Sequence, residues 1–451
     1  MNLNLYKNIY FLGIGGVSMS SLALILKKRG FNVAGYDEAR GSEVELLEKS
    51  GVTVCRTVDQ IDLTCFDAVV FTAALHETHP AMIKAAASGK PVFSRAKLLG
   101  AIAEGYTHSV GIAGTHGKST SCGMLSSICE HDGDSTYIVG AVLPFIGSAY
   151  KLGSDDRLVF EACEYCDSFL EFHPSLAVVL NVKLDHTDYF KDEAAITKSF
   201  CKYISGSKTA LINSDDPNAL YAAKQSGVTF HTFSVNGSAD FSAIYDKNAQ
   251  GFPQFDVYEK GVYAAHIALA VPGMHNIYNA LAAYSAARLM GISPETAVKG
   301  LADFHGVKRR FELCEGFAGV SSFYADYAHH PDEVKATLTA ARGITNGRLI
   351  AVFQPHTYSR LKSFFNEFAD ALSLADKIIV TDVYAARETD DGTISGEMLA
   401  DAVNGAEYNG NFETIASELL ADAKKGDTVM ILGAGDIVHL ADILKNYVKK
   451  S

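Results

Sequence analysis

The sequence has little clustered positive charge and no long hydrophobic run. Its 451 residues carry a formal net charge of −13, and no basic run is longer than Lys27-Lys28-Arg29. Because phosphate backbones are bound by clustered Lys and Arg, this argues against a nucleic-acid partner. No apolar stretch reaches the roughly 18 residues that cross a bilayer, and the apolar N-terminal run ends in glycines instead of a cleavage site. We therefore expect a cytoplasmic protein without membrane insertion.

Cysteine is also scarce. Eight cysteines in a chain of this length are too few for a disulfide scaffold. Cys163 and Cys166 form one Cys-x-x-Cys pair, but a redox or zinc interpretation needs a thioredoxin-like context or a second pair of ligands. The sequence offers no second pair, so this interpretation is disfavoured.

The pattern that is present is an alternation of strand-like and helix-like runs. Hydrophobic residues make up 48% of the chain and charged residues 20%, which is typical of globular proteins. The alternation predicts an α/β fold with mainly parallel sheets, and the length favours two to four domains. Similar units begin near the N-terminus, near residue 107 and near residue 319. In the third unit we expect helices at 331–343 and 361–376.

The first unit has an incomplete dinucleotide-binding fingerprint. Gly13-x-Gly15 follows the first expected strand, but Ser18 occupies the position of the third glycine. Asp37 ends the second expected strand, where a ribose-binding carboxylate would lie. These residues leave three interpretations open: a dinucleotide site, a nucleotide-sugar site or a purely structural turn.

The second unit contains GIAGTHGKST (residues 111–120), which lies between a strand-like run and a helical pattern. The general P-loop pattern has glycine where this chain has Ile112, so an ordinary glycine-bearing turn is the alternative. Lys118 followed by two hydroxyl residues at a helix start favours a phosphate site. There Lys118 would neutralise phosphate charge and the Ser119 hydroxyl would bind Mg²⁺.

Further candidate ligands follow other strand-like runs, at the edge where open parallel sheets bind ligands. Acidic and histidine side chains there could complete a Mg²⁺ site, and they are Glu161, Glu164, Asp185, His186 and Asp188. In the third unit the segments DYAHHP (326–331), FQPHTYSR (353–360) and GAGD (433–436) also lie at strand ends. Arg360 and the histidines suit a carboxylate-bearing substrate, although a structural role for each is equally compatible.

Together these motifs resemble the Mur ligases, the ATP-dependent amide-forming enzymes of peptidoglycan synthesis. The family's loop signature, Gly-Thr-x-Gly-Lys-Ser/Thr, matches residues 114–119, and His116 at its variable position resembles the alanine-adding members. The similarity extends in order through GIGGVSMS, GYD, SRAKLL, LDHTDYF, HNIYNA, KRRFE, DYAHHPDEV, FQPHTYSR, DVYAARE and GAGDI. It implies three domains: a Rossmann-like UDP-sugar-binding domain (1–107), a central P-loop ATPase domain (108–313) and a Rossmann-like amino-acid-binding domain (314–451).

The resemblance also implies the roles of individual residues. The cofactors would be ATP and Mg²⁺, with Mn²⁺ as an alternative, and the metal ligands would be Ser119, Glu164 and His186. ATP would be bound by Gly114, Thr115, His116, Gly117, Lys118, Ser119, Thr120, His275, Asn276, Asn279, Arg310 and Asp326. The alanine site would hold Tyr327, His329 and Arg360. The UDP-sugar side would hold Gly15, Gly16, Ser18, Asp37, Thr72 and Arg95.

The reaction implied by the resemblance joins L-alanine to the lactoyl carboxylate of UDP-N-acetylmuramate through an acyl phosphate, giving ADP and phosphate. Its catalytic residues would be Lys118, Glu164, His186, His329 (the candidate base) and Arg360. Three alternatives remain: a ligase that adds a tripeptide, a non-catalytic nucleotide-sugar-binding regulator, and a nicotinamide-dependent dehydrogenase. Both a monomer and a homodimer are compatible with the sequence.

The chain departs from the family pattern at several positions. Ser18 replaces a glycine of the first loop, and Cys163, Tyr165 and Cys166 replace acidic and serine residues around Glu164. Thr357 stands where some members have arginine, which leaves Arg360 as the expected carboxylate clamp. Arg387-Glu388 replaces a common Gly-Glu.

Overall fold

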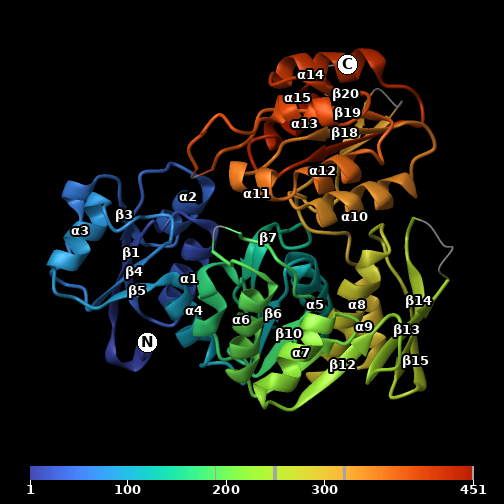
Figure 1. Cartoon of the computed structure of the whole chain (residues 1–451). Coiled ribbons are helices and arrows are strands. Elements are labelled where there is room, and N and C mark those ends of the chain that lie inside the picture. The colour runs from blue at the N-terminus through green and yellow to red at the C-terminus, as the bar shows by residue number, and fades with distance from the viewer. Residues whose placement is uncertain (188, 247–250, 318–320, 387, 449–451) are drawn as a thin grey trace.

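The structure is a computed structural model that describes residues 1–187, 189–246, 251–317, 321–386 and 388–448, so the candidates Asp188 and Arg387 lie outside the described residues. Three sheets flanked by helices form three domains in chain order (Figure 1). The N-terminal domain lies beside the central domain, and the C-terminal domain lies above it (Figure 1). The predicted three-domain α/β fold is confirmed. No helix among these residues is long and apolar enough to span a membrane.

The N-terminal sheet is parallel throughout, with the strand order β3-β2-β1-β4-β5. Its strands are β1 (Asn8–Leu12), β2 (Asn32–Tyr36), β3 (Thr53–Cys55), β4 (Ala68–Phe71) and β5 (Val92–Ser94). Its helices are α1 (Val17–Lys28), α2 (Ser42–Lys49), α3 (Pro80–Ala87) and α4 (Arg95–Ala103). The chain places β2 and β3 on one side of β1, and β4 and β5 on the other. Such a switch point, at the carboxyl ends of the strands, is where open α/β sheets bind ligands.

The central sheet has the order β15-β14-β13-β12-β11-β10-β6-β9-β7-β8. The pairs from β13 to β7 are parallel, whereas β8, β14 and β15 pair antiparallel at the two edges. The mainly parallel sheet was predicted, but the antiparallel edges were not. The strands are β6 (His108–Ala113), β7 (Thr136–Leu143), β8 (Ser148–Lys151), β9 (Arg157–Glu161), β10 (Leu176–Val179), β11 (Thr209–Asn213), β12 (Phe230–Ser234), β13 (Phe241–Tyr245), β14 (Gln254–Glu259) and β15 (Val262–Ala268).

Helix α5 (Lys118–Asp132) fixes the glycine loop to the centre of this domain. Its residues from Ser121 to Cys129 are all buried, so packing holds the helix on every side. Small residues permit that packing: a Cβ on Gly300 of α9 (Pro294–Ala302) would lie 2.4 Å from the Cα of Ile128. The other helices of the domain are α6 (Glu193–Ser205), α7 (Pro217–Ser226) and α8 (His275–Leu289).

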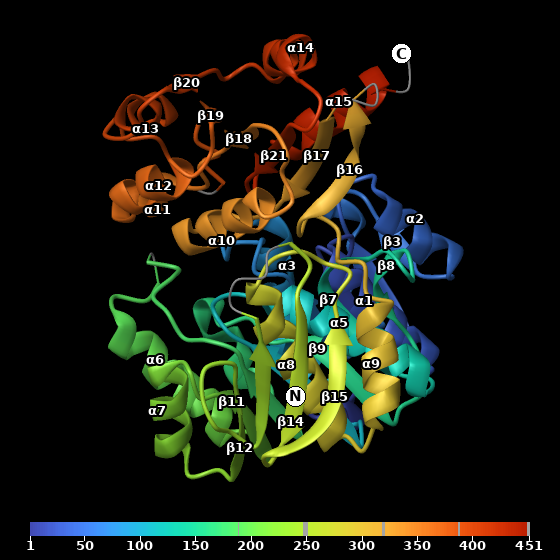
Figure 2. The ribbon, with the colours of Figure 1, turned by 90° about the vertical axis from the view of Figure 1, so that its right-hand side faces the viewer.

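The C-terminal sheet has the order β16-β17-β21-β18-β19-β20, and only β16 among its described strands is antiparallel to its neighbour. The strands are β16 (Glu312–Phe317), β17 (Ser321–Asp326), β18 (Leu349–Phe353), β19 (Lys377–Val380), β20 (Ala406–Tyr408) and β21 (Thr428–Leu432). The helices are α10 (Pro331–Arg342), α11 (Tyr358–Ser363), α12 (Phe365–Leu372), α13 (Gly396–Ala402), α14 (Phe412–Asp422) and α15 (Val438–Val448). Figure 2 shows α10 facing the central domain.

Two details of the third unit differ from the prediction. Strand β16 begins at Glu312, ahead of the first strand expected there. The single helix expected at 361–376 is wrong, because Phe364 leaves helical geometry (φ −127°, ψ 30°) and separates α11 from α12. The apolar spacing continues across this break, so periodicity alone does not reveal it.

Candidate active site

The loop between β6 and α5 depends on two glycines with positive φ. Gly114 has φ 151°, and Gly117, with φ 86°, is the N-cap of α5. A Cβ on Gly117 would lie 2.4 Å from Oδ1 of Asn279, and one on Gly114 would lie 2.9 Å from Cβ of Leu180. Both positions therefore exclude a larger residue on conformational and steric grounds.

A side chain missed by sequence reasoning, Asn181, holds the same loop. Its Oδ1 accepts from the His116 amide at 2.8 Å, and its Nδ2 donates to the His116 carbonyl at 3.0 Å. Asn181 follows β10 closely, in the LNVKLD stretch that ends at Asp185. The loop's backbone is thus held to the neighbouring strand by a bidentate amide contact.

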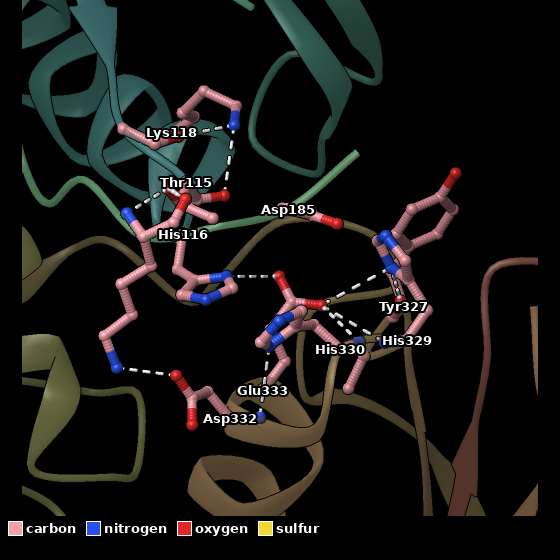
Figure 3. A network of polar contacts seen from close by, with 12 residues as sticks. Thr115, His116, Lys118, Asp185, Tyr327, His329, His330, Asp332 and Glu333 are labelled. Carbon is pink, nitrogen blue, oxygen red and sulfur yellow. Dashed lines mark hydrogen bonds and ion pairs between the residues drawn. The ribbon is translucent and has the colours of Figure 1, made fainter. Parts of the chain in front are cut away.

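Lys118 and Glu164 form a buried ion pair at the end of the loop. The Lys118 Nζ lies 2.9 Å from Oε2 of Glu164. It also donates to the Thr115 carbonyl at 3.1 Å (Figure 3). Burial by itself would lower the pKa of Lys118, but the charge of Glu164 outweighs it, so the pKa is raised and the lysine stays charged. Glu164 is 0% exposed, and a buried carboxylate charge is stable only beside a cation.

The predicted metal ligands gather around this ion pair. The Ser119 hydroxyl donates to Oε2 of Glu161 at 2.9 Å, and the His186 Nε2 lies 3.8 Å from Oε1 of Glu164. A hydroxyl, two carboxylates and one imidazole form an oxygen-rich donor set, which fits Mg²⁺. His186 has φ 50°, an uncommon conformation for a non-glycine residue that is found at functional sites.

Arg360 of α11 reaches across to the central domain. Its Nη2 lies 2.9 Å from Oδ1 of Asp185, and the two side chains are 8% and 6% exposed. Burial alone would raise the pKa of Asp185, but the Arg360 charge holds it well below its usual range. The Arg360 Nη1 also donates to Nδ1 of His356 at 3.1 Å. Burial, followed by the Arg360 charge, lowers the pKa of His356 to about 4.

Glu333, which sequence reasoning also missed, joins the two domains from the first turn of α10. Its Oε1 lies 3.3 Å from Nδ1 of His116, and its Oε2 accepts from the His329 amide at 3.1 Å (Figure 3). The same Oε1 lies 3.7 Å from Nη1 of Arg310. The available signal is local: Glu333 is the N3 residue of a capping box that begins at His330.

The candidate base and its neighbours lie close to Glu333. His329 Nδ1 donates to the Tyr327 carbonyl at 2.9 Å, which leaves Nε2 as the proton-accepting nitrogen. Burial lowers the pKa of His329 to about 3, so the imidazole is neutral at pH 7. Burial raises the pKa of Asp326 to about 6, and Arg310 partly offsets this effect. The Tyr327 ring lies 5.1 Å from the Arg310 guanidinium.

A cavity of about 510 Å³ lies between the glycine loop, α8 and α10. The predicted ATP-site residues that line it are His116, Gly117, Ser119, Thr120, His275, Asn276, Asn279, Arg310 and Asp326. Gly114, Thr115 and Lys118, which were also predicted for the ATP site, are not among the lining residues. Lining residues that were not predicted include Asn181, Asp215, Tyr278, Asp332 and Glu333. Burial lowers the pKa of His275 to about 4, so this ring is neutral at pH 7.

The residues predicted for the UDP-sugar side form a separate cluster at the carboxyl end of β1. The Gly15 amide donates to Oδ2 of Asp37 at 2.7 Å, and the Arg95 Nη1 donates to the Ser18 hydroxyl at 3.0 Å. Thr72 closes the turn, because a Cβ on Gly13 would lie 2.4 Å from its Cγ2, and Gly16 is the N-cap of α1. The serine that departs from the family pattern thus binds a predicted site arginine.

The described residues contain no disulfide, so Cys163 and Cys166 are not joined to each other. Burial raises the pKa of Cys163 to about 11, which leaves it protonated and unreactive at pH 7.

The fold and the site define a three-domain α/β protein whose glycine loop, at the start of α5, shares a cavity with α10 of the C-terminal domain. Family models of the Mur ligase catalytic, middle and glutamate ligase domains match residues 8–107, 112–287 and 309–435. The UDP-N-acetylmuramate–L-alanine ligase of Caldicellulosiruptor bescii is 40% identical over 452 residues, covering 98% of this chain and 99% of that protein. The chain belongs to the Mur ligase family.

Two solved structures have the same fold. The UDP-N-acetylmuramate–alanine ligase of Thermotoga maritima superposes with a TM-score of 0.82 at 24% identity, covering 99% of this chain and 100% of that one. The murein peptide ligase of Psychrobacter arcticus gives a TM-score of 0.73 at 23% identity, with 99% of each chain covered.

Proposed function

We propose that this chain is a cytoplasmic enzyme of peptidoglycan precursor synthesis. It joins L-alanine to the lactoyl carboxylate of UDP-N-acetylmuramate and converts ATP to ADP and phosphate. The main support is a continuous path of contacts from the glycine loop to the C-terminal domain. Lys118 contacts Glu164, His186 lies 3.8 Å from Glu164 and 3.9 Å from Asp185, and Asp185 pairs with Arg360. Groups suited to a phosphate and to an amino-acid carboxylate therefore lie within one connected site.

ATP occupies the 510 Å³ cavity in this proposal, with its phosphates at the N-terminus of α5. Ser119, Glu164 and His186 hold Mg²⁺ or Mn²⁺, and Glu161 supports Ser119. The metal, when bound, offsets negative charge on the phosphates. Lys118 then exchanges part of its contact with Glu164 for the phosphoryl oxygens.

The reaction begins when the lactoyl carboxylate attacks the γ-phosphate, because a free carboxylate is a poor electrophile. Lys118 stabilises the charge on the transferred phosphoryl group, and an acyl phosphate and ADP result. Arg360 binds the alanine carboxylate and places the amine at the acyl carbon. His329 accepts the amine proton through Nε2, and phosphate leaves. Closure of the C-terminal domain excludes water, which would otherwise hydrolyse the acyl phosphate.

The domains divide the substrates between them. Residues 1–107 bind the UDP-sugar through the cluster at the end of β1, residues 108–313 bind ATP, and residues 314–451 bind alanine with Tyr327, His329 and Arg360. None of the residues predicted for the UDP-sugar side lines the central cavity, which supports this division.

The test is phosphate release by the purified chain with ATP, Mg²⁺ and UDP-N-acetylmuramate, measured with a panel of amino acids and with the tripeptide. We expect release that depends on the UDP-sugar and is fastest with L-alanine. Preference for the tripeptide would instead assign the chain to the activity named for the murein peptide ligase. No release with any acceptor would favour a non-catalytic regulator.

A further inference from the structure

Two histidines from different domains face each other beside the glycine loop. His116 belongs to the loop and His330 is the N-cap of α10, and their ring centroids are 4.9 Å apart. Within the described parts of the chain, the Nε2 atom of each ring is buried and has no hydrogen-bond partner. Two buried polar nitrogens without partners are costly in a protein interior and call for an explanation.

A carboxylate completes this group. His116, His330 and Asp332 each offer a ligand atom, and these atoms lie within 4.8 Å of one another (Figure 3). Asp332 binds the Lys183 Nζ through Oδ2 at 2.5 Å, which positions the carboxylate beside the histidines. Zinc bonds to nitrogen of about 2.0–2.1 Å place tetrahedral ligands roughly 3.3 Å apart, so the three atoms need to approach by roughly 1.5 Å at most.

The surroundings of His116 match those of a metal-bound histidine. Its Nδ1 lies 3.3 Å from the Glu333 carboxylate, which favours a proton on Nδ1 and leaves the buried, unpartnered Nε2 available as the metal-binding nitrogen. Metal-binding histidines commonly donate their second ring nitrogen to a carboxylate in this way.

His330 has to change its tautomer before it can bind a metal through Nε2. Its Nδ1 accepts from the Asp332 amide at 3.3 Å, so in the metal-free form the proton is on Nε2. When a metal binds Nε2, that proton moves to Nδ1 and the 3.3 Å hydrogen bond from the Asp332 amide is lost. Losing this helix-capping bond lowers the metal affinity about fivefold. The ring itself is neutral at pH 7, since burial, followed by His116, lowers its pKa to about 4.

We propose that His116, His330 and Asp332 bind a divalent transition metal of the zinc class, with water as the fourth ligand. Two imidazoles and one carboxylate suit Zn²⁺ or Co²⁺, whereas Mg²⁺ prefers oxygen ligands. The site is separate from the Ser119, Glu164 and His186 set. Because its ligands come from the central and C-terminal domains, the bound metal holds these domains together. The inference does not depend on which amino acid the enzyme ligates.

The test is a Co²⁺ titration of the full chain in millimolar Mg²⁺, followed by visible absorption and by competition with Zn²⁺. We expect one Co²⁺ per chain, displaced by Zn²⁺ and retained in Mg²⁺. His330→Asn keeps a good N-cap residue but removes the Nε2 ligand, and it should weaken binding at least tenfold. The matched control is His266→Asn, which alters an exposed histidine beside Asp256 and should leave binding unchanged.

A second readout covers the case in which His330→Asn folds poorly. Asp332→Asn should also weaken Co²⁺ binding about tenfold, and Zn²⁺ should raise the melting temperature of the unaltered chain more than that of this variant. The proposal is overturned by absence of the Co²⁺ signal, by its loss in Mg²⁺, or by unaltered binding in a folded His330→Asn or Asp332→Asn variant.

Discussion

Replacing Lys118 with methionine tests the centre of the proposed site, because it separates the structural effect of the lysine from its catalytic one. The ammonium lies 2.9 Å and 3.2 Å from the two oxygens of Glu164, whose side chain is fully buried. Removing one partner of a buried pair leaves an uncompensated charge and costs about 3–5 kcal/mol. For a domain of the size of the central one, this loss of stability corresponds to a decrease in melting temperature of roughly 6–20 °C.

The double variant Lys118→Met/Glu164→Gln distinguishes the two effects. Neutralising Glu164 removes the unpaired charge, so most of the lost stability should return. Phosphate release should stay at least a hundredfold below that of the unaltered chain, since the charge that stabilises phosphoryl transfer is still missing. Binding of the UDP-sugar should persist in both variants, because its predicted site is in the N-terminal domain.

The assay combines thermal unfolding in the absence of nucleotide with phosphate release under saturating substrates. Lys183→Met is the matched control for stability: its ion pair with Asp332 is about half exposed, so its loss should change the free energy of unfolding by no more than about 1 kcal/mol. Turnover of Lys118→Met like that of the unaltered chain would refute the role of the loop lysine. Equal melting temperatures for Lys118→Met and the double variant would refute the ion-pair reasoning.

Three other predictions concern substrate binding, acid stability and the loop. Arg360→Lys keeps the positive charge but loses the planar guanidinium fork that binds a carboxylate. Steady-state kinetics should therefore show the KM for alanine rising at least tenfold and the KM for ATP changing less than about threefold. Equal changes in the two KM values would remove Arg360 from the amino-acid site. His275 and His329 have folded pKa values of about 4 and 3, below the unfolded value of about 6.5. The unfolded chain therefore binds more protons below pH 6.5, and each histidine should lower stability by up to about 1.4 kcal/mol per pH unit as the pH falls from 6.5 towards 4; denaturant unfolding at pH 7 and pH 5 measures this, and equal stability would contradict it. Gly117→Ala should raise the KM for ATP at least tenfold, because φ 86° strains alanine and the Cβ would collide with Asn279 of α8. The control Gly227→Ala has a similar backbone strain (φ 74°) but no atom within 4 Å, and it should leave the KM for ATP unchanged. Equal effects of the two substitutions would count against the role of the loop in ATP binding.

Much of the fold could be predicted because its signals are local. Apolar runs that alternate with helical patterns predicted the parallel sheets, and the ordered motifs predicted the Mur ligase family, which the comparisons confirm. The break at Phe364 and the antiparallel strand β16 were not predicted. The apolar spacing continues through the break, and β16 acquires its direction only by pairing with β17.

The candidate site, like the fold, was predicted only in part. Lys118, Glu164 and His186 were identified by residue type and position, and the structure brings them together, although their catalytic roles remain predictions. Glu333 and Asn181 were missed because their local sequence marks no ligand site: the capping box that contains Glu333 indicates only the start of a helix. Both become part of the site through contacts with residues that are distant in the chain.

The sequence by itself determined the glycine loop, its lysine and the strand ends where polar residues emerge, because backbone conformation and periodicity are properties of short segments. Only the tertiary structure decided the partners: Lys118 with Glu164, Asp185 with Arg360, and His116 with His330. The physical reason is that burial and pairing depend on which domains meet. A carboxylate or an imidazole acquires its charge state from neighbours that lie up to hundreds of residues away in the chain.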